Sequence, residues 1–243
     1  RDRLRSRGLG DVYKRQIDRT LRDAYRSRRL TGLPVIAAFN GTNNLKYRGF
    51  LKACNRRAAA YACQQINGYL QPNRATIINL LSIEEREGKS FLAKYFAQYW
   101  ESEGLHVRIV NHDIDFEKES KSYVQAQQLS DFWQLNDAEQ QPDIILVEYP
   151  ALCHYDVPEK VLAESDFNLL VANAARLWSE KDNARLRSVK DILKDKSLYL
   201  YLNNADRETV ESFTGELPPH NSVHSFFRRL AQLGLTSQKA AVK

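Results

Sequence analysis

Residues 75–90 restrict the fold of this chain more than any other segment. They read as a short apolar run rich in β-branched residues (75–81), a polar loop (82–87) and a Gly-Lys-Ser triplet (88–90). The triplet opens a segment in which apolar residues recur at helical spacing as far as Trp100. A strand, a loop and Gly-Lys-Ser at the start of a helix are typical of a phosphate-binding loop. There the loop N–H groups face the phosphates, the Lys reaches the β- and γ-phosphates, and the Ser hydroxyl ligates Mg²⁺.

The loop departs from the pattern G-x-x-x-x-G-K-[ST]. Ile83 stands where the first Gly is expected, so left-handed backbone is costly through most of the loop. The loop also carries Glu84, Glu85 and Glu87, and we expect these carboxylates near the place of a triphosphate, with Arg86 alone to offset them. We therefore expect a chain built like a nucleotide-binding protein whose nucleotide chemistry is degraded. The competing interpretation is an ordinary strand, loop and helix that happens to contain Gly-Lys-Ser.

Strands alternate with helices from residue 76 to residue 203, which predicts a parallel sheet covered by helices, a three-layer α/β/α fold. The run at 143–148 is apolar without alternation, as in a parallel strand that is buried on both faces. Apart from the loop motif and the helix after it, the expected strands are 35–39, 105–110, 143–148, 167–172 and 198–202. The expected helices are 17–29, 47–70, 120–129, 158–164, 179–194, 206–213 and 221–233.

Ligands of such sheets bind at the carboxyl ends of the strands. The segments that follow those ends, and that we expect to converge, are 82–90, 111–115, 148–151 and 203–206. Phosphoryl transfer needs acidic groups there that hold Mg²⁺ and orient the nucleophile. We therefore predict Lys89, Asp113 and Glu148 as catalytic residues, with Ser90 and Asp113 as the metal ligands. The competing interpretation is that carboxylates are common at strand ends.

Two histidines near the same edge, His112 and His154, lack the helical i,i+4 spacing of a metal site, and we expect both to be surface loop residues. Cys54, Cys63 and Cys153 show no C-x-x-C spacing, which argues against a zinc site and a disulfide framework. We expect Cys54 and Cys63 to be small buried residues of a helix.

The basic residues are concentrated at the N-terminus. Residues 1–30 hold 11 of the 36 Lys and Arg residues but 4 of the 30 Asp and Glu residues, which leaves 25 basic and 26 acidic residues in the rest of the chain. A neutral body argues against nucleic acid as a partner. No run approaches the roughly 20 apolar residues of a membrane span.

We expect four segments along the chain. Residues 1–16 resemble translated adapter sequence and are expected to be non-native, with a genuine basic arm as the alternative. Residues 17–72 hold a basic helix, a short strand and a long helix. Residues 73–235 form the P-loop domain, and residues 236–243 a polar tail. The sequence contains no Met, even at position 1, so we expect that it begins partway into a longer gene product.

From Leu21 to Leu233, the chain resembles the cytoplasmic domain of bacterial tyrosine kinases (BY-kinases) that are fused to polysaccharide chain-length regulators. Residues 29–39 resemble the segment after the second membrane helix of that family. The remaining motifs are 82–90 for the Walker A loop, 107–113 for the Walker A′ strand, 143–150 for Walker B and 202–206 for a later strand.

The resemblance implies ATP and Mg²⁺ as cofactors. The Walker A residues Glu87, Gly88, Lys89 and Ser90 would bind the nucleotide phosphates, and Asn203 would contact adenine. The implied function is that of a tyrosine-kinase-like domain of an exopolysaccharide or capsule chain-length or export protein.

The resemblance also implies where the protein works and with what. It places the domain at the cytoplasmic side of the bacterial inner membrane, with the membrane-embedded polysaccharide export and polymerisation machinery as partner. Residues 17–30 would contact anionic lipid. Homo-oligomerisation stays open, because the family's Glu-x-x-Arg helix is not recognisable near residues 46–57.

Several positions depart from the family pattern. Asn111 replaces the first Asp of Walker A′, Glu148 replaces the Walker B Asp, and Arg86 stands where Gly is usual. Residues 234–243 contain no tyrosine cluster. We therefore expect a degenerate ATP site in a domain that acts through partner contacts. The alternatives are an active protein-tyrosine kinase, a partitioning-type ATPase, or a free-standing nucleotide-binding protein.

Overall fold

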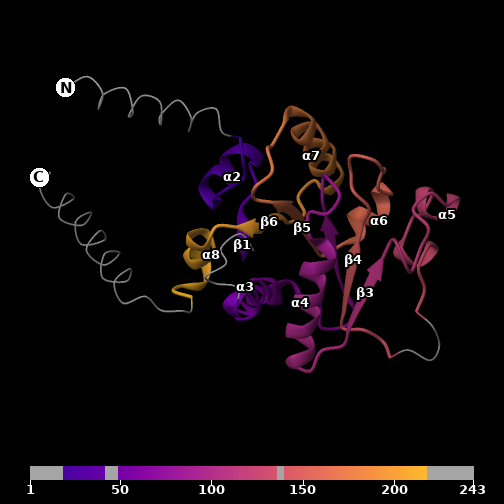
Figure 1. Cartoon of the computed structure of the whole chain (residues 1–243). Coiled ribbons are helices and arrows are strands. Elements are labelled where there is room, and N and C mark those ends of the chain that lie inside the picture. Colours follow the sequence, from indigo (N-terminus) through magenta and orange to yellow (C-terminus); the bar gives the residue numbers. More distant parts are fainter. Residues whose placement is uncertain (1–18, 42–48, 136–139, 218–243) are drawn as a thin grey trace, which may run out of the picture.

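The computed structural model describes residues 19–41, 49–135 and 140–217. These residues form a parallel six-stranded sheet with the strand order β1-β6-β5-β2-β4-β3 (Figure 1). The strands are β1 (Val35–Asn40), β2 (Thr76–Leu81), β3 (Val107–Asn111), β4 (Ile144–Glu148), β5 (Phe167–Asn173) and β6 (Leu198–Ala205). The predicted parallel sheet is confirmed.

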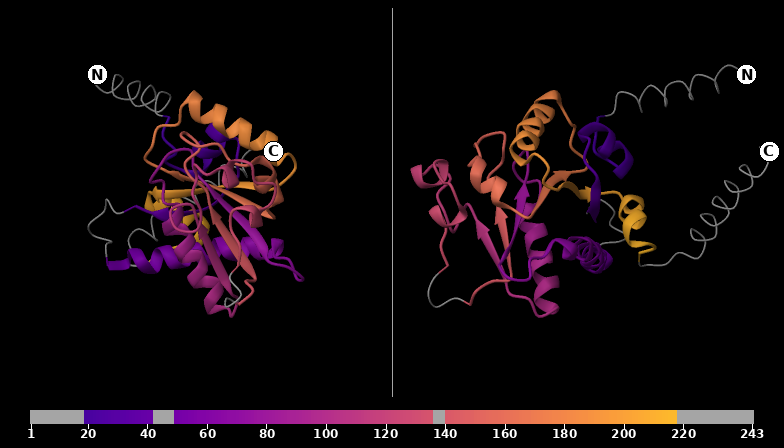
Figure 2. Two further views of the ribbon diagram at one scale, coloured as in Figure 1. Left: turned by 90° about the vertical axis from the view of Figure 1, so that its right-hand side faces the viewer. Right: turned by 180° about the vertical axis from the view of Figure 1, so that it is seen from behind.

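Helices cover both faces of this sheet. The helices α3 and α4 pack together against one face, and α6 and α7 lie on the opposite face (Figures 1 and 2). The helices are α2 (Ala24–Thr31), α3 (Leu51–Ile66), α4 (Lys89–Ser102), α5 (Lys121–Val124), α6 (Glu159–Glu164), α7 (Glu180–Leu193) and α8 (Arg207–Thr214), with the 3₁₀ helices η2 (Asn67–Tyr69) and η3 (Leu129–Asp131). The three-layer α/β/α prediction is confirmed.

The core lies between the sheet and these helices. Every residue of β2 and of β4 is buried, because both strands lie inside the sheet with helices on each side. Phe96 and Trp100 of α4 are fully buried, and Phe96 packs edge-on against Tyr201 of β6 at a centroid distance of 5.8 Å. The core therefore fixes α4, and with it the loop motif, onto the centre of the sheet.

The basic helix begins later than its predicted start. It was expected over 17–29, but α2 begins at Ala24, after Asp23, whose carboxylate accepts the N–H of Arg26 at 2.8 Å. Thr20, which lies within the predicted range, instead forms an antiparallel bridge with Leu177. The N-cap, and not the basic composition, sets the start of this helix.

Two other helices are shorter than predicted. The helix expected over 47–70 ends as α3 at Ile66 and continues as the 3₁₀ turn η2, where the side chain of Asn67 accepts the indole N–H of Trp100. The helix expected over 120–129 is divided into α5 and η3. There the carboxylate of Asp131 accepts backbone N–H groups and turns the chain. The helix expected over 221–233 lies outside the described residues.

The strand before the loop motif belongs to the same sheet as the later strands. β1 pairs with β6, so residues on both sides of the expected division at 72–73 share one sheet. Cys54 and Cys63 are buried in α3, as predicted. Among the residues that the structure describes, no helix combines the length and the apolar character needed to cross a membrane.

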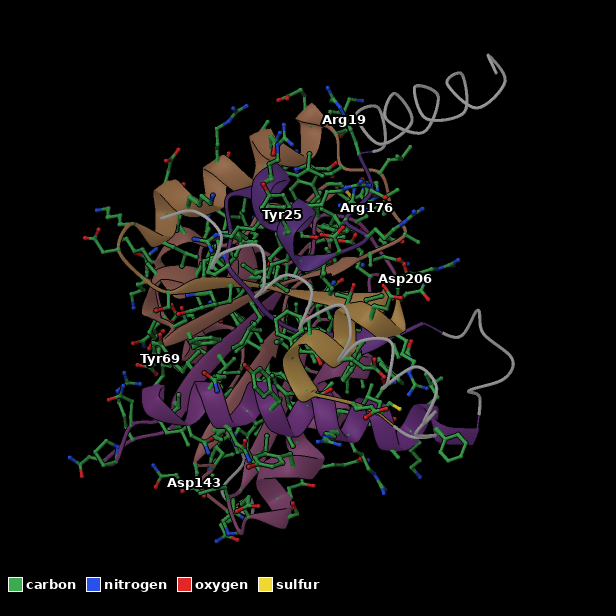
Figure 3. All side chains as sticks on the ribbon, turned by 90° about the vertical axis from the view of Figure 1, so that its left-hand side faces the viewer. Arg19, Tyr25, Tyr69, Asp143, Arg176 and Asp206 are labelled. Atoms are coloured by element: carbon green, nitrogen blue, oxygen red, sulfur yellow. The ribbon has the colours of Figure 1, made fainter. Side chains whose placement is uncertain are left out.

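All strands run in one direction, so their carboxyl ends meet at one edge of the sheet. Arg176 and Asp206, which follow β5 and β6, lie at one edge in Figure 3, whereas Tyr69 and Asp143, which precede β2 and β4, lie at the other. The loop motif follows β2 and therefore lies at the same edge as Arg176 and Asp206.

Candidate functional site

The loop after β2 ends in a strained turn that leads directly into α4. Gly88 has a φ of 101°, a left-handed conformation that favours glycine, and a Cβ at this position would overlap the side-chain amide of Asn203. Gly88 is the N-cap residue of α4 and has no side chain that could cap its first turn. The N-terminus of this helix therefore presents backbone N–H groups, which suit an anion.

Lys89 points into the loop and is almost completely buried. Its Nζ donates to the hydroxyl of Ser82 at 2.6 Å, and the residue is 7% exposed. Burial lowers the pKa of Lys89, and the carboxylates of Glu148 and Glu87 oppose that shift. The ammonium is thus held in place inside the loop, as a phosphate-binding lysine requires.

Ser90, Glu148 and Asn111 form a connected group at the ends of β4 and β3. The Ser90 hydroxyl donates to Oε1 of Glu148 at 2.5 Å, and the Asn111 amide donates to Oε2 of the same carboxylate at 2.8 Å. Asn111 and Glu148 are direct neighbours in the register of β3 and β4. The Ser90 hydroxyl and the Glu148 carboxylate are oxygen donors of the kind that Mg²⁺ takes, so these two residues fit the metal.

Asp113 approaches the same place but stays in solvent. Its side chain is 68% exposed, and Oδ1 lies 3.4 Å from Nε2 of His112. It lines the same cavity as Lys89, Ser90 and Glu148, so the structure brings the predicted catalytic and metal residues together. Within the described part of the chain, Ser90 bonds to Glu148 and not to Asp113.

This cavity, which we call the loop cavity, has a volume of about 350 Å³. The loop motif forms one wall, and Asp113 and Glu148 form part of the other. Lys118 and Tyr155 also line it, with the Lys118 ammonium 4.5 Å from the centroid of the Tyr155 ring. No motif pointed to these two residues, because neither lies next to a strand end.

His112 differs from its prediction. We expected a surface loop histidine, but its side chain is only 13% exposed and lines the loop cavity. Its buried Nδ1 has no hydrogen-bond partner among the described residues. Burial lowers the pKa of His112, and the neighbouring Asp113 opposes that shift. His154 is exposed, as expected.

Glu87 also differs from its prediction. It was expected to face the nucleotide with only Arg86 as an offsetting charge, but its carboxylate accepts from Nε of Arg176 at 2.6 Å and from the N–H of Glu84 at 3.2 Å. Glu87 is 2% exposed, and burial raises its pKa while Arg176 opposes the shift. The carboxylate of Glu87 thus has the half-buried guanidinium of Arg176 as its partner. This cation was not predicted, because it lies in the segment after β5, which carries no recognisable motif.

Asn203 lies against the loop. Its side-chain amide donates to the carbonyl of Glu87 at 3.1 Å, and its Oδ1 accepts the N–H of Asn204 at 2.9 Å. Glu85 is exposed and lines the loop cavity, whereas Glu84 is half-buried and does not line it. The predicted adenine contact of Asn203 stays a prediction.

Comparison with known proteins agrees with this architecture. The kinase domain of the Escherichia coli tyrosine kinase ETK is similar in structure, with a TM-score of 0.52 at 14% sequence identity, over 72% of this chain and 92% of that domain. The chimerical protein CapA2B2 also has a TM-score of 0.52 at 14% identity, over 76% of this chain and 100% of its own. No family model and no curated protein matches the sequence. The chain therefore has the fold of a bacterial tyrosine kinase domain, built around a P-loop.

Proposed function

We propose that this chain is the P-loop, tyrosine-kinase-like domain of an exopolysaccharide or capsule chain-length or export protein. In this proposal it binds Mg²⁺ and ATP or ADP at the loop cavity. Its degenerate site turns ATP over slowly or not at all, and the domain acts through contacts with partners at the inner membrane.

One observation carries the nucleotide part of the proposal. Lys89, Ser90 and Glu148 lie together at one cavity, next to the uncapped N-terminus of α4. A buried ammonium, a hydroxyl and a carboxylate in that position are the groups that hold a phosphate chain and its Mg²⁺. Burial removes the Lys89 ammonium from water, which disfavours its charged form. A bound anion would offset that loss of solvation.

The composition of the metal group supports weak turnover. The amide of Asn111 donates to Glu148 and carries no charge. Among Ser90, Asn111 and Glu148, the buried carboxylate is therefore that of Glu148 alone. The other candidate, Asp113, is largely exposed. Phosphoryl transfer depends on acidic groups that hold Mg²⁺ and orient the nucleophile, and this site has fewer of them than the family pattern.

Calorimetric titration of the full chain with Mg²⁺ and ATP or ADP tests the proposal. Lys89→Ala should abolish binding, whereas Lys94→Ala, on the exposed side of the same helix, should leave it unchanged. No binding at millimolar nucleotide to the wild-type chain would contradict the nucleotide part of the proposal.

The second candidate is an active kinase or ATPase. It is favoured by the position of Asp113, which lines the cavity beside Lys89 and Ser90. Phosphotyrosine or phosphate release that Lys89→Ala abolishes would establish this candidate and overturn the degenerate site. Binding without turnover would support the degenerate site.

The membrane and polysaccharide roles rest on the sequence resemblance. The lipid contact alone has support from the structure, in the exposure of Arg19, Arg22, Arg28 and Arg29 before and along α2, a basic surface that suits anionic lipid. Sedimentation with phosphatidylserine vesicles tests the lipid contact. The double variant Arg28→Glu and Arg29→Glu should weaken it, and Arg56→Glu with Arg57→Glu, exposed on α3, should not.

A further inference from the structure

Three side chains with metal-binding atoms meet where the start of the loop lies against the segment after β4. A carboxylate oxygen of Glu84, the sulfur of Cys153 and a ring nitrogen of His154 all lie within 4.8 Å of one another. We call these residues the Glu84 cluster. Glu84 and Cys153 are half-buried and His154 is exposed. Neither Cys153 nor His154 lines the loop cavity, so the cluster is separate from the proposed nucleotide site.

The backbone holds these side chains together from two distant segments. The N–H of Leu152 donates to the carbonyl of Ser82 at 3.0 Å, and the N–H of Cys153 donates to the carbonyl of Ile83 at 2.9 Å. The N–H of His154 closes a turn onto the carbonyl of Ala151 at 3.1 Å. The segment after β4 is therefore hydrogen-bonded to the start of the loop. The backbone that carries the three side chains is thus already ordered before a ligand binds.

A catalytic nucleophile is the other use of a Cys, His and Glu group, and the structure speaks against it. Burial and the Glu84 carboxylate, which accepts from the thiol, together raise the pKa of Cys153 to about 11. A reactive cysteine needs a low pKa and a positive environment. Here the thiol lies beside a carboxylate, which is the opposite of the positive environment that activates a cysteine.

We propose that the Glu84 cluster binds a divalent transition metal, of which Zn²⁺ is the best fit. Sulfur, imidazole nitrogen and carboxylate oxygen are the three ligand types of zinc, and three protein ligands leave a fourth position for water. A thiolate ligand disfavours Mg²⁺ and Ca²⁺, which take oxygen. On binding, the Cys153 thiol releases its proton to solvent, the neutral His154 ring donates a lone pair, and no redox change occurs.

Titration of the full chain with Co²⁺ in place of Zn²⁺ tests the site, because a cobalt–thiolate bond gives a charge-transfer absorption band. We expect this band in the wild-type chain and its absence in Cys153→Ser. Glu84→Gln and His154→Ala should weaken binding by at least about tenfold, as expected for the loss of a ligand. His106→Ala, an exposed histidine before β3, is the matched control and should bind like wild type. Cobalt binding without the band, or a band that survives in Cys153→Ser, would overturn the proposal.

Thiol alkylation gives a second readout that does not depend on the spectrum. Cys54 and Cys63 are buried, whereas Cys153 is partly exposed, so a native-state reagent should label Cys153 first. Zn²⁺ should slow that labelling in the wild-type chain, EDTA should restore it, and Mg²⁺ should have no effect. Equal protection by Zn²⁺ in wild type and in His154→Ala would contradict a shared site. Circular dichroism of each variant separates loss of a ligand from loss of the fold.

Discussion

The buried carboxylate of Glu87 and the half-buried guanidinium of Arg176 form an ion pair, with 2.6 Å between Oε1 and Nε, although the residues lie 89 positions apart in the sequence. Arg176 also donates to Asp182 at 2.8 Å, in the first turn of α7. The pair therefore ties the P-loop to the segment after β5 and to the start of α7, and it places a cation beside the Glu87 carboxylate at the wall of the loop cavity.

Removal of Arg176 should destabilise the fold. Arg176→Met leaves the carboxylate of Glu87, which is 2% exposed, without its cation, and should lower the free energy of unfolding by about 3 kcal/mol. Arg185→Met is the control, because Arg185 is exposed and its pair with Asp156 is long, at 3.7 Å. Urea denaturation measures both, and adding Glu87→Gln to Arg176→Met should recover much of the loss. Equal losses of stability in Arg176→Met and Arg185→Met would contradict a stabilising ion pair between Arg176 and Glu87.

Lys89 should make stability depend on pH in the alkaline range. Burial lowers its pKa below the ordinary 10.5, so the folded protein binds the proton less tightly than the unfolded chain. The resulting destabilisation is complete below the folded pKa and disappears as pH rises towards 10.5. Lys89→Met should therefore be more stable than wild type at neutral pH, with a difference that shrinks as pH rises. Urea denaturation across this range measures the difference, and one that is constant with pH would refute the burial effect.

Arg86 should be replaceable by glycine with a gain in stability. Its φ of 58° lies in the left-handed region, which costs about 1 kcal/mol for a residue with a Cβ. Arg86→Gly should raise the free energy of unfolding by about that amount. The same substitution at Arg56, exposed within α3, should lower it by about 1 kcal/mol, because glycine weakens a helix interior. Thermal denaturation measures both variants. A change in stability of the same sign in Arg86→Gly and in Arg56→Gly would contradict backbone strain at Arg86.

Asn111→Asp should make the stability of the folded protein depend on Mg²⁺. It replaces the donor to Glu148 with a second carboxylate, and should cost about 2 kcal/mol without metal, since a hydrogen bond to a charged group is lost. Mg²⁺ between the two carboxylates should reverse that loss. Asn73→Asp, exposed before β2, controls for general effects of the ion. Urea denaturation with and without Mg²⁺ measures the effect, and the absence of a Mg²⁺ response in Asn111→Asp would show that the group does not hold the metal.

Much of the fold could be predicted because its signals are local. The fully buried strands β2 and β4 appear in the sequence as unbroken apolar runs, and α4 appears as apolar residues at helical spacing. The ends of helices were less predictable. α2 begins at Ala24 and α3 ends at Ile66 because of single contacts, the Asp23 cap and the bond from Trp100 to Asn67.

By itself, the sequence determined that a strand, a loop and Gly88-Lys89-Ser90 lead into a helix of a parallel sheet, because each element depends on neighbours a few residues away. Only the tertiary structure decided which distant groups meet at the loop. It turned Glu87 towards Arg176, placed His112 in the loop cavity and gathered the Glu84 cluster. These contacts follow from the order β5-β2-β4-β3 in the sheet, which packs segments far apart in the chain against one loop.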